Sequence, residues 1–426
     1  MLFILADDLG FADLSCYGQK SFGTPVLDRL AANGLRFTQG YANSAVCSAT
    51  RTALVTGRYQ QRFRIGLEEP VGPTLSLSLP NGTPTIASRF KALGYRTALV
   101  GKWHVGSLPD HGPTRFGYDH FFGISSGSAD YFGHGGALAS MTEAKREGLY
   151  DNETPTSREG YLTDVLADEA VRWIVEDDSP FFLSLHFNAP HWPWEGPDDR
   201  AHSESLEVLR DTTGGSLETY AKMVRAMDAA IGRVLARLGS SGHGHDTLIV
   251  FTSDNGGERY SDMWPLTGMK GELLEGGIRV PLIVNWRGKV KPGRVIDQVM
   301  TSMDFMPTLL AAAGGAGLAM GETDGVNLLP QILGEAPDVR RQLFWRYHAN
   351  DQAAARDGDW KYLRLGGKEH LFNVRQDPRE RAELSSVHPE QFAALKAKYA
   401  AWDAQMLPYT PENRSEDVKE IFPDRY

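Results

Sequence analysis

Three things are scarce in this sequence: cysteine, long apolar runs and excess positive charge. The chain has only two cysteines, Cys16 and Cys47. This number excludes a scaffold held together by several disulfides but is compatible with one disulfide bond between the two. For Cys16 we expect the ordinary role of a small buried hydrophobic residue. No apolar stretch approaches the roughly 20 residues that a membrane-spanning helix needs, which predicts no membrane span.

The charge balance is acidic, with 44 Lys and Arg against 54 Asp and Glu and a net charge of −10. Nucleic-acid binding requires a basic face that neutralises phosphates, so this balance argues against a nucleic-acid partner. A small anionic substrate remains compatible with it, because a few local cations can outweigh the overall sign.

The first residues carry no export signal of the usual kind. Met1 leads through a short apolar run directly into Asp7 and Asp8, without a basic segment or a cleavage site. As written, the sequence predicts a cytoplasmic protein. A strand that begins at the first residues is unusual, so a longer native start, and hence a periplasmic or secreted protein, stays open.

The composition, 41% hydrophobic and 23% charged residues, is typical of a soluble globular protein with a large core. Several apolar runs lack alternation and therefore predict buried parallel strands that are covered on both faces. These runs are Leu2–Ala6, Thr97–Val100, Phe181–Phe187, Leu248–Thr252 and Pro281–Trp286. Helical patterns lie between them, including an apolar stripe at Val224, Met227, Ile231, Val234 and Leu238.

This alternation predicts an α/β fold whose mainly parallel central sheet has helices on both faces. After about residue 335 the pattern changes to short strands joined by Gly- or Asp-containing turns. We expect strands at Gln342–Tyr347, Trp360–Leu365 and His370–Val374, followed by a helix at Glu390–Gln405. The sequence therefore predicts a catalytic domain, residues 1–335, and a C-terminal α+β subdomain with an antiparallel sheet, residues 336–426.

Polar residues follow four of the predicted strands, at the strand ends where open α/β sheets bind ligands. They are Asp7 and Asp8, then Lys102 and His104, then His191, then Asp254 and Asn255. The carboxylate and amide oxygens among them are ligands that Ca²⁺ or Mg²⁺ prefers, whereas Zn²⁺ prefers nitrogen and sulfur. Two adjacent carboxylates repel each other unless a cation lies between them, which favours a metal site over ordinary turns or helix caps.

Cys47 is predicted to lie at the start of a helix, because residues 49–56 suit a helix and Gly57 would end it. The helix dipole favours negative charge there, and Arg51, four residues on, would project to the same side. A nucleophile beside a cation suits attack on an anionic ester. A buried structural cysteine with a surface arginine is an equally weighted alternative at this point.

Together these segments resemble the type I sulfatases, which belong to the alkaline-phosphatase-like superfamily. The resemblance covers nearly the whole chain, in the right order, and several of the motifs are individually specific. It rests on residues 4–10 (ILADDLG), 47–51 (CSATR), 101–104 (GKWH), 190–193 (PHWP), 253–257 (SDNGG) and 275–281 (EGGIRVP), and on residues 357–362 and 370–378 in the tail.

The resemblance implies a calcium-dependent sulfate-ester hydrolase and a role for each matching residue. Asp7, Asp8, Asp254 and Asn255 would bind Ca²⁺, with Mg²⁺ as the less favoured ion. A formylglycine-generating enzyme would oxidise Cys47 to formylglycine, whose hydrate would complete the metal site and attack sulfur. Arg51, Lys102, His104 and Lys270 would hold the sulfate or the hydrate, and His191 would protonate the leaving oxygen. The family usually has proline where this chain has Ala49, which leaves open which maturing enzyme accepts the motif.

Two other functions stay open: a formylglycine-dependent phosphodiesterase or phosphonate monoester hydrolase of the same superfamily, and an inactive binding protein that kept the fold. The natural sulfate ester is also open among carbohydrate, aryl and alkyl sulfates. Trp192, Trp194, Tyr131 and His134 could stack on a sugar or an aryl ring, and packing in the core is at least as good an explanation for each.

Overall fold

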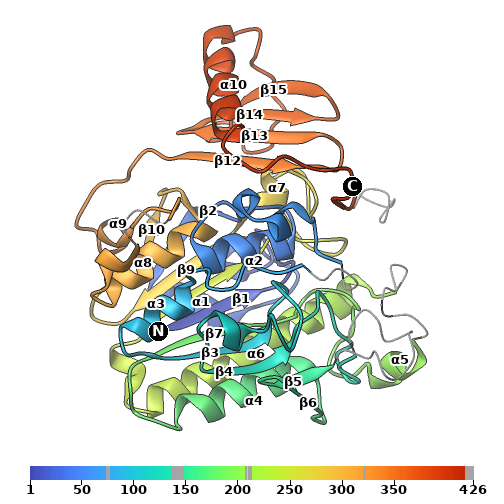
Figure 1. Cartoon of the computed structure of the whole chain (residues 1–426), viewed down its shortest axis with the longest axis vertical. Helices are drawn as coiled ribbons and strands as arrows, with labels where there is room; N and C mark the ends of the chain where they lie inside the picture. Colours follow the sequence, from blue (N-terminus) through green and yellow to red (C-terminus); the bar gives the residue numbers. More distant parts are fainter. Residues whose placement is uncertain (73–76, 136–147, 207–208, 210–213, 320–322, 418–426) are drawn as a thin grey trace.

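A large central sheet organises the molecule (Figure 1). The computed structural model describes residues 1–72, 77–135, 148–206, 209, 214–319 and 323–417. Within them, strands β1 to β11 form one sheet in the order β10-β2-β9-β8-β1-β7-β3-β4-β5-β6, with β11 also paired to β2. The strands are β1 (Leu2–Ala6), β2 (Leu35–Tyr41), β3 (Arg96–Lys102), β4 (His120–Ile124), β5 (Leu149–Asp151), β6 (Thr154–Thr156), β7 (Phe181–His186), β8 (Leu248–Ser253), β9 (Arg279–Trp286), β10 (Arg294–Ile296) and β11 (Met300–Thr301).

The middle of this sheet is parallel, as the sequence predicts. Strand β1 lies between β7 and β8 and runs parallel to both, with Leu2 opposite Leu183 and Ile249. β3 continues the parallel set between β7 and β4. Parallel strands end at the same edge, so residues that follow β1, β3, β7 and β8 emerge side by side.

One expectation about strand direction is wrong. The sequence predicts a parallel strand at Pro281–Trp286, but β9 is antiparallel to both of its neighbours, β8 and β2. An apolar run without alternation indicates that both faces of a strand are buried. It does not indicate whether the strand runs parallel or antiparallel to its neighbours.

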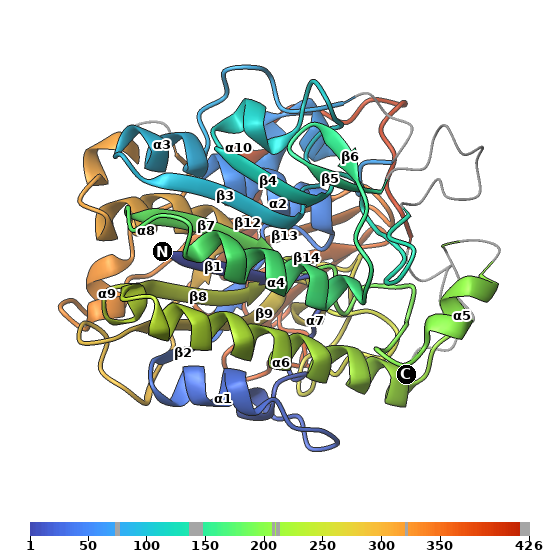
Figure 2. The ribbon, with the colours of Figure 1, turned by 90° about the horizontal axis from the view of Figure 1, so that it is seen from below.

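Helices cover both faces of the sheet, and a hydrophobic core lies on each face. Side chains of β1 alternate between the two cores: Leu2 and Ile4 pack in the first core, and Phe3 and Leu5 pack in the second. Figure 2 shows α4 and α6 lying across the strands on one face. The first core includes α1 (Pro25–Ala32), α4 (Leu162–Ile174) and α6 (Leu217–Ser240); the second includes α2 (Cys47–Thr56), α3 (Ile86–Ala92), α8 (Phe305–Ala312) and α9 (Leu329–Leu333); α5 (Arg200–Ser205) and α7 (Glu275–Ile278) are short. The predicted stripe of α6 is fully buried, and no helix in the described ranges is long and apolar enough to cross a membrane.

The C-terminal part forms a second, antiparallel sheet, visible at the top of Figure 1. Its strands, in spatial order, are β12 (Gln342–Tyr347), β13 (Gln352–Asp357), β14 (Trp360–Leu365) and β15 (Lys368–Asn373), and they are followed by α10 (Pro389–Asp403). A third core joins this unit to the main one, because Trp345 and Trp402 share it with Val46 and Ala49 beside Cys47. The small α+β unit is thus confirmed, and the exact boundary at residue 335 stays a prediction.

Candidate active site

The four predicted metal ligands meet where β1 and β8 end. Asp7 and Asp8 directly follow β1, Asp254 and Asn255 directly follow β8, and the backbone N–H of Asp254 donates to the carbonyl of Ala6 at 3.1 Å. Asp8 has φ 61°, in the left-handed region that side chains rarely adopt. Such a conformation costs energy and is concentrated at functional sites. Here it accompanies a hydrogen bond from Asn255 Nδ2 to Asp8 Oδ1 at 2.7 Å.

Helix α2 begins at Cys47, ends at Thr56 and is capped by Gly57, which has φ 66°, so the predicted helix is confirmed. Every residue of α2 is buried, Arg51 included, which contradicts the alternative of a surface arginine. Arg51 Nε donates to Asp254 Oδ2 at 2.9 Å, and its Nη1 donates to the carbonyl of Lys102 at 2.8 Å. The guanidinium is therefore fixed between two strand ends.

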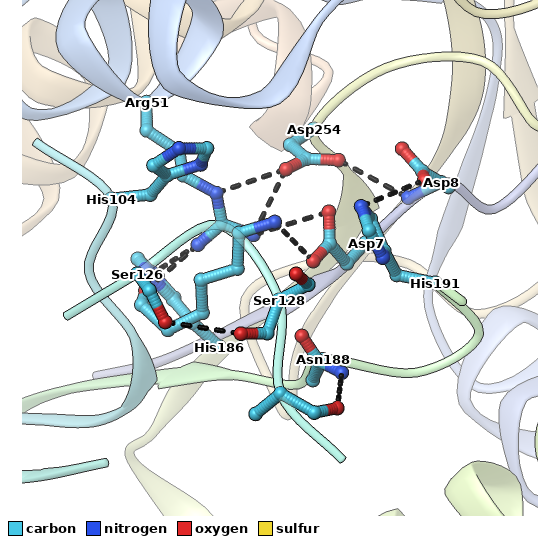
Figure 3. A network of polar contacts seen from close by, with 12 residues as sticks. Asp7, Asp8, Arg51, His104, Ser126, Ser128, His186, Asn188, His191 and Asp254 are labelled. Carbon is cyan, nitrogen blue, oxygen red and sulfur yellow. Dashed lines mark hydrogen bonds and ion pairs between the residues drawn. The ribbon is translucent and has the colours of Figure 1, made fainter. Parts of the chain in front are cut away.

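Two buried lysines bind the remaining carboxylates of the site. Lys102, the last residue of β3, forms an ion pair with Asp7. Lys270, from the loop between β8 and α7, lies 2.7 Å from Asp8 Oδ2 and 3.1 Å from Glu258 Oε1. Figure 3 shows Asp7, Asp8 and Asp254 side by side, with Arg51 reaching toward Asp254.

The two predicted histidines have defined tautomers. His104 Nε2 lies 3.1 Å from the carbonyl of Val71, and because a carbonyl only accepts, Nε2 carries the proton. By the same reasoning His191 donates from Nδ1 to the carbonyl of Trp192 at 2.6 Å, and its Nε2 lies 3.5 Å from Asp8 Oδ2. Burial, together with Lys102 for His104 and Lys270 for His191, lowers the pKa of each imidazole well below 6.5.

The chemistry of the donor set fits a hard cation. Asp7 Oδ1 and Asn255 Oδ1 are buried and have no hydrogen-bond partner among the described residues. Ligand atoms of Asp7, Asp8, Cys47 and His191 lie within 4.8 Å of one another. Burial, and next the charge of Asp254, raise the pKa of Asp7 well above 3.8. A buried oxygen without a partner is costly, and Ca²⁺ takes oxygen ligands of this kind.

The unmodified thiol of Cys47 is poorly suited to act as a nucleophile. Its exposed fraction is 1%, and burial raises its pKa to about 12, although Lys102 and Lys270 lower it in part. The thiolate, not the thiol, is the reactive form, so an unmodified Cys47 would be a weak nucleophile at neutral pH. Cys16, half-buried at the edge of the first core, is also free, so the two cysteines form no bridge.

Three residues of the site were missed in the sequence. Glu258 is the second partner of Lys270, and only its place shortly after Asn255 could have signalled it. His186, a polar residue within an apolar strand, lies 3.4 Å from Arg51 Nη1 and donates to the Lys102 carbonyl at 3.2 Å. A Cβ on Gly127 would lie 2.6 Å from the His104 ring, a contact that no local pattern reveals.

Most of the aromatic candidates for substrate stacking are core residues. Tyr131, with no exposed surface, stacks on Tyr161 and donates its hydroxyl to the carbonyls of Asn188 and His191. Trp194 and His134 are buried as well, which leaves the half-buried Trp192 beside His191. Tyr131 thus supports the loop that carries His191 instead of facing a ligand.

Comparison with known proteins gives consistent matches. The sulfatase family model matches residues 1–316, and the model of the N-sulphoglucosamine sulphohydrolase C-terminal region matches residues 270–400. Steryl-sulfatase of Mus musculus is 32% identical over 81% of this chain and 67% of its own length. Arylsulfatase A of Homo sapiens is 33% identical over 93% of this chain and 86% of its own length.

Solved structures agree over almost the full length. The structure of Ps i-CgsB in complex with k-i-k-neocarrahexaose has a TM-score of 0.84 and 28% identity, and covers 99% of this chain and 96% of its own. A phosphonate monoester hydrolase of Agrobacterium radiobacter, TM-score 0.64, is 22% identical over 98% and 99% of the two chains and shares the fold alone. These matches lead to one conclusion: the chain belongs to the sulfatase family, within the alkaline-phosphatase-like superfamily, and is a sulfuric ester hydrolase.

Proposed function

We propose that this sulfatase hydrolyses sulfate monoesters with a formylglycine made from Cys47 and with Ca²⁺ held by Asp7, Asp8, Asp254 and Asn255. The observation that carries the proposal is the place of Cys47: it starts a helix, beside the buried carboxylates of Asp7 and Asp8, as a thiol that burial keeps neutral. Conversion to an aldehyde would replace this poor nucleophile with a group whose hydrate bears hydroxyls.

The charges of the site support a bound divalent cation. Four buried carboxylates, Asp7, Asp8, Asp254 and Glu258, face three cations, Arg51, Lys102 and Lys270, which leaves one formal negative charge. That sign would repel a sulfate monoester, which is itself an anion. A calcium ion would turn the sum to one positive charge, and it would satisfy the unpartnered oxygens of Asp7 and Asn255.

The residues around Cys47 would hold the sulfate group. When present, the hydrated aldehyde would supply the attacking oxygen, and Ca²⁺ would stabilise charge on the sulfate oxygens. The guanidinium of Arg51 is already held by Asp254 and by the carbonyl of Lys102, so it would need no rearrangement to bind the sulfate group. Lys102 and Lys270 would add two further buried donors. Cations placed beforehand stabilise the charge that develops in the transition state.

The histidines would move protons at opposite sides of the sulfate. His104 keeps its proton on Nε2 for Val71, so its Nδ1, which has no partner among the described residues, can accept a hydrogen bond from the hydroxyls on residue 47. His191 donates from Nδ1 to the carbonyl of Trp192, so Nε2, which lies 3.5 Å from Asp8 Oδ2, is the nitrogen that would give a proton to the leaving alcohol oxygen. It can do so only from the imidazolium, protonated on both nitrogens, a form that burial disfavours and that Asp8 and a bound sulfate anion would favour. General acid catalysis of this kind typically contributes about 10²–10⁴-fold.

We propose sulfated carbohydrates as the substrate class. The support is the nearly full-length likeness to the structure solved with k-i-k-neocarrahexaose. Rates on a panel of carbohydrate, aryl and alkyl sulfates would test this: a carbohydrate sulfate is expected to give the highest kcat/KM, and an aryl sulfate that outruns every carbohydrate would contradict it.

Mass spectrometry of the peptide containing residue 47 tests the central proposal. Active protein is expected to show the aldehyde mass in place of the cysteine mass. The peptide containing Cys16 from the same digest is the control and should keep its thiol. Full activity in protein whose Cys47 is entirely unmodified would refute the formylglycine mechanism.

A further inference from the structure

The segment Glu68–Val71 touches the site at two points. The carbonyl of Val71 accepts the hydrogen bond from His104 Nε2 at 3.1 Å. The backbone N–H of Val71 donates to Ser48 Oγ at 2.8 Å, and Ser48 directly follows Cys47 on α2. The position of this one residue therefore affects both the histidine and the start of the catalytic helix.

Glu69, two residues before Val71, is a fully buried carboxylate on which three donors converge. The Tyr409 hydroxyl donates to Oε1 at 2.5 Å. The Ser415 hydroxyl and the backbone N–H of His348 donate to Oε2, each at 2.8 Å. All three donors belong to the C-terminal unit, more than 270 residues away in the chain.

The backbone of the same segment is also held from the C-terminal side. Glu69 N donates to the carbonyl of Arg414 at 2.9 Å, and Glu416 N donates to the carbonyl of Glu69 at 2.8 Å, so the two segments pair as a short parallel bridge. Glu68 accepts from Asn413 Nδ2 at 2.7 Å. We call residues 409–416 the C-terminal strap, because they lie against residues 68–69 along their length.

The strap is itself fixed to the second sheet. The guanidinium of Arg346, on β12, lies 4.4 Å from the centre of the Tyr409 ring, and the ring of His348 lies 4.6 Å from it. The hydroxyl of Tyr347 donates to the carbonyls of Glu69 at 3.3 Å and Glu416 at 2.8 Å. A continuous set of contacts thus runs from the second sheet, through Glu69, to His104.

We propose that Glu69, held by the C-terminal strap, is a positioning residue for His104. It fixes the carbonyl of Val71, which in turn keeps the proton of His104 on Nε2 and turns Nδ1 toward residue 47. The inference rests on the proposed function in one respect, the participation of His104 in the reaction. It gives the second sheet a part in catalysis, although that sheet supplies none of the residues proposed to touch the substrate.

The kinetic test uses Glu69→Gln and Tyr409→Phe in the full-length, matured, calcium-loaded enzyme. An amide presents an N–H to a converging donor, so Glu69→Gln is expected to lower kcat about 10- to 100-fold with little change in KM, by misplacing a catalytic group. Tyr409→Phe removes one donor and should give a smaller loss. Glu380→Gln is the matched control: this carboxylate is also buried between the two units, on Lys361 and the N–H of Glu275, and should keep the wild-type kcat.

A double-mutant cycle separates positioning from general destabilisation. If Glu69 acts through His104, then Glu69→Gln should cause no further loss of kcat/KM in a His104→Ala background, because contacts in one network are not additive. Losses that multiply would overturn the proposal.

The ¹⁵N–¹H spectrum of histidine-labelled enzyme gives a readout that needs no activity. The His104 Nε2–H signal is expected to move in Glu69→Gln and in Tyr409→Phe but not in Glu380→Gln. An unmoved His104 signal in both strap variants would overturn the positioning role. A moved signal in protein that lacks formylglycine would leave that role standing while the proposed mechanism failed, so the two failures can be told apart.

Discussion

Two buried clusters of charge in this molecule use the same residue types and differ in how completely they are paired. The interface cluster, between the main unit and the second sheet, comprises Glu275, Arg279, Arg356, Lys361 and Glu380. Three of its four carboxylate oxygens accept hydrogen bonds, from Lys361, Tyr41 or the backbone N–H of Glu275, and the fourth, Glu380 Oε1, lies 2.8 Å from Lys361 Nζ. At the active site, Asp7 Oδ1, Asn255 Oδ1 and His104 Nδ1 are left without hydrogen-bond partners among the described residues.

The carboxyl groups of Glu275 and Asp7 differ in the same sense, although burial raises the pKa of Glu380, in the interface cluster, to about 7. Burial would raise the pKa of Glu275, but Lys361 and Arg279 overcome it and lower the pKa to about 2. The pKa of Asp7 is instead raised, by burial and then by Asp254. The interface cluster has three cations for its two carboxylates, whereas the active site has three cations for four carboxylates. Incomplete pairing, more than the presence of buried charge, therefore distinguishes a site built for a ligand from one built for stability.

The largest effect is expected from Cys47→Ala. Loss of a nucleophile commonly lowers kcat by about 10⁴-fold or more, and here the small, buried change should leave the melting temperature almost unaltered. Steady-state hydrolysis of a sulfate ester and a thermal melt measure the two quantities. Cys16→Ala is the control and should keep full activity; activity surviving in Cys47→Ala would place the chemistry elsewhere.

The opposite pattern is expected for Lys361→Met, in the interface cluster. Removing this fully buried ammonium takes the cation away from Glu275 Oε1 and Glu380 Oε1, so the free energy of unfolding should fall by about 3–5 kcal/mol. Urea denaturation measures this loss, and kcat of the folded fraction should be unchanged. A large loss of kcat with intact stability would show that the two clusters are not functionally separate.

The His191→Ala variant tests which histidine of the active site protonates the leaving group. If Nε2 protonates the leaving oxygen, the variant should lose about 10²–10³-fold in kcat/KM on sugar or alkyl sulfates and much less on an activated aryl sulfate, whose phenolate leaves without a proton. His104→Ala, at the other side of the sulfate, should lose similar amounts on both. The measurement is kcat/KM against leaving-group pKa, and a slope in His191→Ala equal to that of the wild type would exclude the acid role.

Calcium should stabilise the enzyme only through the incompletely paired cluster. A ligand at 100 times its Kd adds about 2.7 kcal/mol to the free energy of unfolding, so the melting temperature of chelator-treated protein should rise as calcium is added back. Asn255→Ala removes an unpartnered oxygen without changing charge and should abolish most of that rise. Glu275→Gln should melt lower than wild type yet keep the rise; an equal response of all three proteins would argue against a site at these residues.

The sequence predicts much of this because the relevant signals are local. Apolar runs mark buried strands, and polar residues directly after them identify the edge at which Asp7, Lys102, His191 and Asp254 meet; their roles stay predictions. Strand β13 was missed since its centre, Ala353–Ala355, lacks β-branched and aromatic residues, and the direction of β9 depends on neighbours that burial alone does not specify. The contact of Gly127 with His104 depends on how two neighbouring loops pack, and the contact of Glu69 with Tyr409 joins segments 340 residues apart, so no local pattern signals either.

The burial of helix α2 also sets the order of two events, oxidation of residue 47 and folding of the chain. All ten of its residues are covered, by the sheet on one side and by the third core at its start. An enzyme can oxidise residue 47 only where it can reach that side chain, so on the proposed mechanism maturation comes before the chain closes over α2. Oxidation of Cys47 therefore has to precede folding. A chain that folds with its thiol intact should stay inactive until it is unfolded and oxidised.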